Sequence, residues 1–316
     1  MPGLIFFRCR SLHVRNAAAV CGLLVLLSIA SSAVMAQTPG PSAASPNDLR
    51  DSTQVLIYVG PSDHPAGTHE VAAGARLLQY ALSHCNSSET VEALIADEWP
   101  EEAVLRQFDC FVFTGDRFPL AEASDSQAQL DSMQRQIDRG CGIVCYHYAT
   151  GLTTGQVTEE GDHPLLGWLG GYFAMACPHH KSIARIFPAA TIEVAQPRHP
   201  TARGVQDFTL HDEPYIENYF GPHGLHSPTI AVATSQLPPE QPKTQTVAWA
   251  IERADGGRGF GVVMPHFYRN WSDDQLRKLI VNAVVWCGGQ DIPDGGLDSE
   301  LLDLSAYEPE SVEPRR

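Results

Sequence analysis

Gly142-Ile-Val-Cys-Tyr146 is an apolar run of five residues that starts at a glycine and gives way to a polar residue, His147. A short apolar run bounded in this way is typical of a strand that is buried on both faces. Three similar runs precede it, and segments with helical spacing of apolar residues lie between them. These runs are Gln54–Gly60, the weaker Thr90–Ala96, and Phe108–Thr114. This order predicts an α/β fold with a parallel sheet flanked by helices.

The predicted helices have recognisable ends. Thr68 is the expected N-terminal cap of the first helix, and Gly140 should end a second helix over 126–139. Ser272 and Gln275 match a capping box at the start of the last helix, which Gly288-Gly289 should end. The apolar face of this last helix comprises Leu276, Leu279, Ile280, Ala283, Val284 and Cys287.

Two later segments depart from the alternation of strands and helices. Residues 151–242 are rich in Pro, Gly and His, and we expect them to form a long insertion near the edge of the sheet. After them come two strand-like runs, Thr246–Arg253 and Gly259–Met264, joined by Asp255-Gly256-Gly257. A short Asp-Gly turn between two such runs predicts a β-hairpin.

The first 36 residues have the layout of a secretory signal peptide. Three arginines precede the apolar stretch Ala17–Ile29, and Val34 and Ala36 occupy positions −3 and −1 before Gln37. An uncleaved membrane anchor is the alternative, because 17–36 is almost long enough to span a bilayer, although serines interrupt it. We therefore expect export to the periplasm or the extracellular space, with a membrane contact only if the leader stays uncleaved.

The remaining boundaries follow from composition. Residues 37–52 are rich in Pro, Ser and Ala and predict a flexible linker. The folded domain is expected over 53–293. Residues 294–316 form an acidic C-terminal tail that should pack loosely or not at all.

Charge and cysteine content restrict the partners and the chemistry. The chain has 21 Lys+Arg against 37 Asp+Glu, a net charge of −16, which repels phosphate backbones and argues against a nucleic-acid partner. Six cysteines follow the leader. Cys141 and Cys145 would lie ~13 Å apart on one strand, too far for a disulfide. Free, buried thiols are expected.

Polar side chains follow several of the predicted strands. In open parallel sheets, ligands bind beyond the carboxyl ends of the strands. The residues at these positions are Ser62, Asp63 and His64; Gly115 and Asp116; His147 and Tyr148; and His266 and Phe267. Three of the four loops carry a histidine, so we expect His147 and His266 to lie within ~10 Å of each other, a distance that one ligand can bridge.

Six segments, in this order, resemble the ThuA-like (trehalose utilisation) family. Together they run from about Val55 to Pro293, which is nearly all of the predicted domain. The segments are 61–70 (PSDHPAGTHE), 144–149 (VCYHYA), 169–173 (LGGYF), 198–204 (RHPTARG), 212–215 (DEPY) and 257–271, which contains Met264-Pro-His266 and Trp271.

The resemblance implies a fold similar to that of class I glutamine amidotransferases, a flavodoxin-like parallel sheet. Those enzymes carry a nucleophilic cysteine at a sharp turn after a central strand. In this chain His147 occupies that turn, and Cys145 lies back in the strand. Thiolate catalysis and ammonia transfer are therefore not expected.

The candidate catalytic residues are His147, His266, Asp212 and Glu213. Imidazole serves as acid, base or metal ligand, and paired carboxylates can divide acid and base roles. Each residue also has a structural alternative: a backbone hydrogen bond for His147, a contact with Trp271 for His266, and a solvated turn for the carboxylates.

Further residues are candidates for substrate binding, although Glu70 could instead complement the dipole of the first helix. They are His64, His69, Glu70, Asp116, Tyr148, His180 and Tyr215. A divalent metal such as Zn²⁺ is a possible cofactor, with His147, His180 and His266 as candidate ligands. The family places a histidine near 179–180, and we favour His180.

The resemblance implies a protein that acts on a small carbohydrate, a disaccharide or a keto-sugar, and the leader predicts that this protein is exported. Histidine and carboxylate acid–base chemistry of a hydrolase or lyase type would serve this role. The sequence shows no dinucleotide-binding fingerprint, so no redox cofactor is expected. The alternative is a non-catalytic sugar-binding protein on the same fold.

Overall fold

The structure is a computed structural model that describes residues 52–121, 126–301 and 303–307. The predicted signal peptide (1–36) and all of the predicted linker except Ser52 lie outside these residues, so both remain predictions. Within the described part, no helix is long and apolar enough to cross a membrane.

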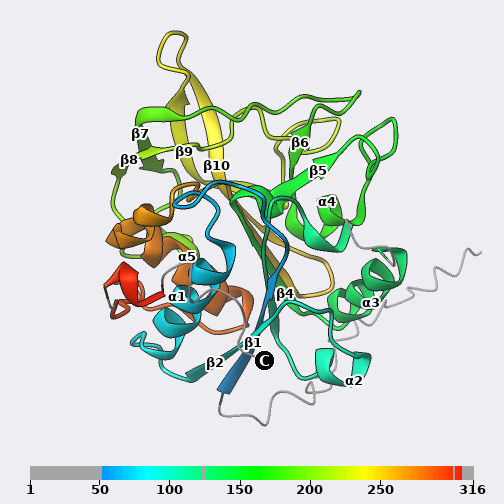
Figure 1. Ribbon diagram of the computed structural model, residues 1–316, viewed down its shortest axis with the longest axis vertical. Helices are drawn as coiled ribbons and strands as arrows, with labels where there is room; N and C mark the ends of the chain where they lie inside the picture. Colours follow the sequence, from blue (N-terminus) through cyan, green and yellow to red (C-terminus); the bar gives the residue numbers. More distant parts are fainter. Residues whose placement is uncertain (1–51, 122–125, 302, 308–316) are drawn as a thin grey trace, which may run out of the picture. The chain divides into compact units, whose positions relative to one another are not determined.

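A nine-stranded sheet runs through the described domain (Figure 1). Its strand order is β2-β1-β3-β4-β11-β10-β9-β7-β8. The first five strands in this order pair in parallel, which confirms the α/β fold with a parallel sheet. These five are β1 (Ser52–Val59), β2 (Thr90–Ala96), β3 (Cys110–Thr114), β4 (Gly142–Tyr146) and β11 (Arg258–Val262).

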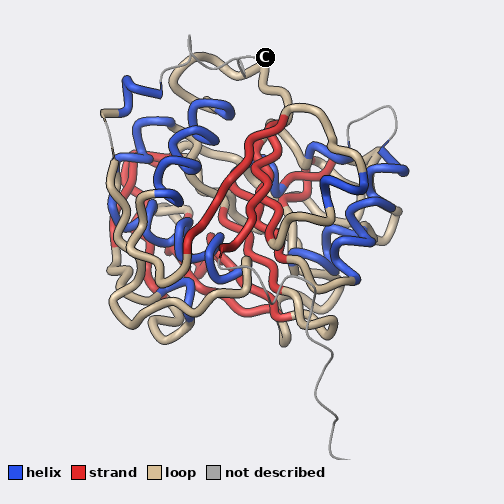
Figure 2. The backbone as a smooth tube through the Cα atoms, turned by 90° about the horizontal axis from the view of Figure 1, so that it is seen from below, coloured by secondary structure: helices blue, strands red, loops and turns tan. Residues whose placement is uncertain are grey.

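Helices cover both faces of the parallel strands. α1 (Val71–Ser83) and α5 (Asp274–Cys287) pack together on one face, and α3 (Ser126–Asp138) and α4 (Pro164–Leu169) pack together on the other. Figure 2 shows the strands between these two layers. A short helix, α2 (Glu102–Leu105), precedes β3. Because both faces are covered, β3 and β4 are buried along their whole length.

The segment 151–242 lies at the edge of the parallel sheet, as expected, but it also extends the sheet itself. After the β10–β11 hairpin, the neighbouring strands run antiparallel. They are β10 (Lys243–Glu252), β9 (Thr229–Leu237), β7 (Phe187–Val194) and β8 (Phe208–Asp212). A separate two-stranded sheet pairs β5 (Gly151–Thr153) with β6 (Phe173–Met175).

Two predicted helix caps are wrong. The Thr68 hydroxyl donates to the carbonyl of Pro65, and α1 starts only at Val71. At the last helix, Asp273 is the cap, and its Oδ1 accepts from the N–H groups of Gln275 and Leu276. Aspartate and serine are both good caps, and the sequence offers them at adjacent positions.

The described part of the C-terminal tail packs on the domain, contrary to expectation. Leu297 and Tyr307 are buried, and the N–H of Leu297 donates to the side chain of Asn282 on α5 at 2.8 Å. α5 also packs against the turn 200–202, where Asn282 donates to the carbonyls of Thr201 and Arg203, and so it buries residues beyond its predicted apolar face. A fully buried leucine contributes about 1.5–3 kcal/mol, so the tail helps to stabilise the fold.

The six cysteines of the described residues are all free, and five of them are buried. The prediction of free thiols is therefore confirmed for these residues.

Candidate functional site

His147 lies at the sharp turn where β4 ends, as predicted. Its backbone is in the left-handed region (φ 49°), a conformation that costs a non-glycine residue about 1–3 kcal/mol. Its imidazole is buried, and Nδ1 lies 3.2 Å from the carbonyl oxygen of Val263. Because a carbonyl can only accept, Nδ1 carries the proton, and Nε2 keeps a free lone pair.

His69, just before α1, is the second buried imidazole. Its Nδ1 lies 2.6 Å from Oδ1 of Asp116, which follows β3. Burial raises the pKa of Asp116, but hydrogen bonds from His69, Asp63 and His64 outweigh burial and bring this pKa below its usual value. The ionised carboxylate accepts the Nδ1 proton of His69, so Nε2 of His69 also presents a lone pair.

His266 follows β11 and is fixed through its backbone. Oδ1 of Asp212 accepts from the N–H of His266 at 2.9 Å and from the N–H of Phe267 at 3.1 Å. Asp212 is completely buried, and its geometry suits support of this loop rather than contact with a substrate. Glu213, the next residue, does reach the ring: its Oε2 lies 3.3 Å from Nδ1 of His266.

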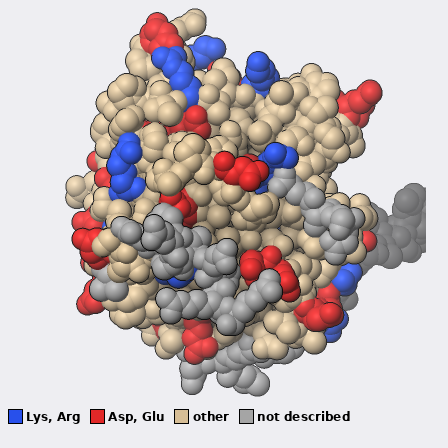
Figure 3. Space-filling view, viewed as in Figure 1, with Lys and Arg blue, Asp and Glu red and all other residues tan. Residues whose placement is uncertain are grey.

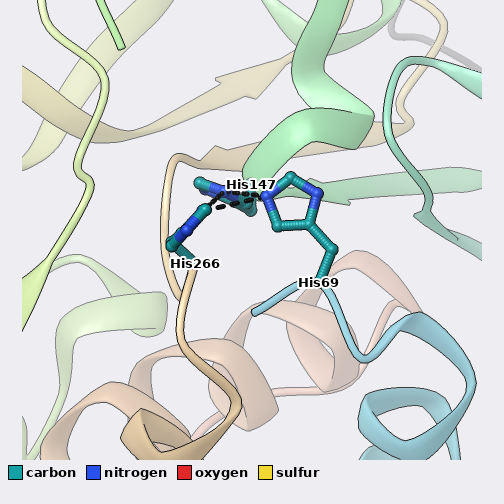
Figure 4. Close-up of side chains that lie close together, drawn as sticks. All are labelled: His69, His147 and His266. Carbon is teal, nitrogen blue, oxygen red and sulfur yellow. Dashed lines mark hydrogen bonds between the residues drawn. The ribbon is translucent and has the colours of Figure 1, made fainter. Parts of the chain in front are cut away.

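The three imidazoles converge on one point, and we call them the histidine cluster. Figure 4 shows their ring nitrogens facing one another. Nε2 of His147 lies 2.8 Å from Nε2 of His69 and 3.0 Å from Nδ1 of His266, and the last two atoms are 2.9 Å apart. At least two of these nitrogens present lone pairs, so the cluster is favourable only with a proton or a cation between them.

Burial opposes protonation of the cluster. Burial, with repulsion from His69 and His64, lowers the pKa of His266 to about 4. Burial, with repulsion from His69 and His266, also brings the pKa of His147 well below its usual value, and burial lowers that of His69. Neutral imidazoles at neutral pH are metal ligands, so a divalent cation fits the cluster better than a proton does.

The spacing of the nitrogens fits one metal ion. Three imidazole nitrogens at about 2.0–2.1 Å from Zn²⁺ lie roughly 2.8–3.4 Å apart for bond angles of about 90–109°. The sides of the triangle, 2.8, 2.9 and 3.0 Å, match the short end of this range. The other nitrogens of His69 and His147 are held by Asp116 and the Val263 carbonyl, as is usual for metal-binding histidines.

Glu213 and Tyr215 border the cluster. Burial, and then repulsion from Asp212, raises the pKa of Glu213 to about 7, and burial raises that of Asp212 to about 6. The Tyr215 hydroxyl lies 2.9 Å from Nε2 of His147. The Tyr215 ring is fixed by stacking on Phe173, with ring centroids 4.1 Å apart, and on His147.

Two predicted site residues, His180 and Glu70, form their hydrogen bonds with backbone groups rather than with the cluster. His180 donates from Nε2 to the carbonyl of Glu217 at 2.6 Å and packs beside Tyr219. Among the described residues, His69 and not His180 joins His147 and His266 in a group that could hold a metal ion, so His180 is corrected as a candidate ligand. Glu70 accepts from the N–H of Gly67 and caps no group of the α1 helix.

Space around the cluster is unequal on its two sides. Behind it, a cavity of about 20 Å³ lined by Thr114, Tyr146 and Trp271 has room for one water molecule. We call the partly exposed border of the cluster its mouth. His64, Tyr148 and Glu213 form the mouth, and their side chains keep some exposure.

The exposed surface carries both signs of charge. On the face shown in Figure 3, the described Lys and Arg side chains are interspersed with Asp and Glu. Hollows of about 540 and 620 Å³ lie beside α4, and no residue of the cluster or the mouth lines either of them.

The predicted geometry is confirmed for the central residues. His147 and His266 are in contact rather than merely within 10 Å, and a carboxylate of the 212–213 pair borders the same site. The sequence did not point to Phe173 or to the carbonyl of Val263. Phe173 follows Gly-Gly-Tyr in a quoted motif, but a backbone carbonyl carries no sequence signal.

A comparison with protein family models shows which family the chain belongs to. The family model described as trehalose utilisation, ThuA, matches residues 54–287. The chain belongs to the ThuA family. This membership gives the protein a carbohydrate-related role and a small sugar as the expected kind of ligand.

Solved structures of other ThuA-like proteins share the fold. A putative ThuA-like protein from Bacteroides uniformis has 15% identity and a TM-score of 0.54, and the match covers 80% of this chain and 96% of the other. One from Parabacteroides merdae has 13% identity and a TM-score of 0.50, with 81% and 99% covered. At such identities the likeness concerns the fold alone. A comparison with curated protein sequences found no match.

Proposed function

We propose that this ThuA-family protein is a carbohydrate-processing enzyme that acts on a disaccharide or a keto-sugar at the histidine cluster. One observation carries the proposal: three neutral imidazoles converge at the carboxyl ends of the strands, with Glu213 at their edge. Their convergence costs backbone strain at His147, the partial burial of Asp116 and the complete burial of Asp212, which a purely structural role does not require.

The residues divide the work as follows. A divalent cation at the cluster would polarise a sugar oxygen. Glu213, with Oε2 at the mouth, is placed to take a proton from the bound sugar or return one to it. The Tyr215 hydroxyl, beside Nε2 of His147, donates a hydrogen bond to the same sugar oxygen.

Amide chemistry by a thiolate has no support at this site. Cys145 is fully buried within β4, and burial raises the pKa of its thiol. A thiol of this kind is a poor nucleophile.

The test is turnover by the purified protein of disaccharides and their keto derivatives, followed by NMR of the sugar with and without added Zn²⁺ or Co²⁺. We expect product from wild type and a loss of about 10²–10⁴ in rate for Glu213→Gln, on the scale of lost acid–base catalysis. Glu252→Gln, on the exposed end of β10, is the matched control. Saturable sugar binding with no product in any mixture would favour the non-catalytic sugar-binding alternative.

We also propose that the protein is exported after cleavage of residues 1–36. The three arginines, the apolar stretch and the small residues before Gln37 support this proposal. Amino-terminal sequencing of the protein from an expressing cell should begin at Gln37. Recovery of only full-length chain in the membrane fraction would contradict cleavage.

A further inference from the structure

Both carboxylate oxygens of Asp116 accept hydrogen bonds from groups of the protein itself. Its Oδ1 accepts from Nδ1 of His69 at 2.6 Å, and its Oδ2 accepts from the N–H of Asp63 at 2.7 Å and from Nδ1 of His64 at 2.8 Å. The carboxylate is 15% exposed, and the imidazole that it holds is only 2% exposed. These contacts leave Asp116 poorly placed for the substrate-binding role expected from the sequence.

We infer that Asp116 is a positioning residue: it holds His69 in the Nδ1–H tautomer that offers Nε2 to the cation, and it links the loop 61–67 to that cation. The inference rests on the cation of the proposed function and adds a residue and a linkage to it.

The tautomer of His69 decides whether the cluster can accept a cation. A neutral imidazole carries its proton on either nitrogen. If that proton were on Nε2, it would point at Nε2 of His147, 2.8 Å away, which has a lone pair because its Nδ1 donates to Val263. A hydrogen bond would then join these two Nε2 atoms, and neither of them would be available to a cation. The ionised Asp116 prevents this hydrogen bond because it accepts the proton at Nδ1.

The same carboxylate fixes the loop 61–67, which lies beside the cluster. The ring of His64 stacks on that of His69, with centroids 3.6 Å apart, and both rings bind Asp116. A cation on Nε2 withdraws electron density from His69 and makes its Nδ1–H a stronger donor to Asp116. Occupation of the cluster should therefore strengthen the anchor of the loop, and an ordered loop should favour occupation by the same factor.

The first experiment measures the affinity for Co²⁺ by its visible spectrum in wild type, Asp116→Asn and Asp109→Asn. We expect Asp116→Asn to bind Co²⁺ about 10–100-fold more weakly, the usual effect of losing a partner of a metal-binding histidine. Asp109 is the matched control, because it lies at the other end of β3 and accepts from the N–H of Gln54. Asp116→Glu keeps the charge and should recover part of the affinity, which guards against a variant that only folds poorly.

A second readout reports the tautomer directly. In ¹⁵N NMR of the cation-free protein, His69 should carry its proton on Nδ1 in wild type and shift toward Nε2 in Asp116→Asn. In a third, Co²⁺ should slow amide hydrogen exchange in 61–67 of wild type but not of Asp116→Asn.

The outcomes separate the two proposals. Equal Co²⁺ affinity in wild type and Asp116→Asn, with the cation lost in His147→Ala, overturns the positioning role and leaves the cation site standing. No Co²⁺ binding by wild type overturns the cation of the proposed function and the linkage with it, and an Nε2–H tautomer in wild type overturns the remaining claim about Asp116.

Discussion

Two pairs of histidines, both next to tyrosines, have different uses in this molecule. His69 and His147 each give one ring nitrogen to an acceptor and aim the other at a shared point. His179 and His180 give Nε2 to separate partners, the Tyr172 hydroxyl and the Glu217 carbonyl. The first pair has free lone pairs that converge, and the second has none that do.

The difference teaches what makes a histidine available for chemistry. Nearness of two imidazoles is not sufficient, because adjacent residues in a loop point in different directions. A second group must hold one nitrogen so that the other points toward a shared site. His180 instead supports the turn at Glu217, whose backbone is in the left-handed region (φ 55°) two residues after Tyr215.

The largest effect is expected from removal of one member of the cluster. His147→Ala should abolish Co²⁺ binding, a loss greater than the roughly 10–100-fold caused by a missing supporting partner. His180→Ala should keep wild-type affinity within a few-fold. Titration of both variants measures the contrast, and weak binding in His180→Ala alone would reverse our assignment of the two pairs.

A smaller effect is expected for the tyrosine beside each pair. Tyr215→Phe keeps the ring on Phe173 but removes the donor near His147, so turnover should fall about 10²-fold, as for one lost donor to a developing negative charge. Tyr172→Phe, which loses only a bond to the Gly161 carbonyl and its contact with His179, is the control. Equal rates of product formation in both variants would remove Tyr215 from the mechanism.

The second pair should matter for stability instead. His180→Ala removes one hydrogen bond to a carbonyl, which is worth about 1 kcal/mol. For a domain of this size, a lower melting temperature by about 2–4 °C should follow. Thermal unfolding followed by circular dichroism tests this, and an unchanged midpoint would mean that the bond contributes nothing.

The smallest effect on activity is expected for Cys145→Ser, one residue from the strand end. Turnover should stay within a few-fold of wild type, since the thiol is buried and not part of the cluster. A loss of about 10⁴-fold or more, typical of a missing nucleophile, would instead support amidotransferase-like chemistry at this site.

The sequence predicted the parallel half of the sheet and the place of the site within it. Apolar runs such as 142–146 are buried on both faces whatever surrounds them, and the residues after them must meet at one edge. His147 and His266 could be found in this way. His69 could only be listed as a candidate, because its role depends on Asp116, 47 residues away.

What the sequence could not predict depends on long-range contacts. The strands β7, β8 and β9 join the sheet through β10. Their sequences are short strand-like runs within a Pro- and Gly-rich segment, and such runs do not indicate which strands they pair with. The packing of Leu297 depends on Asn282, and the composition of the tail gives no sign of it. The prediction that His180 belongs to the site was wrong for the same reason, because its partner is the backbone carbonyl of Glu217.

The position of β11 has a consequence for how the protein is made. Among the described residues, β11 is the last strand, yet it lies in the middle of the sheet, between β4 and β10. Until residues 258–262 emerge from the ribosome, the parallel and antiparallel halves of the sheet have no strand to join them. A contact across more than 100 residues forms slowly, because the intervening chain must first lose its freedom. The site is therefore assembled late in biosynthesis, and a nascent chain that stops before β11 contains most of the fold but lacks His266, which completes the histidine cluster.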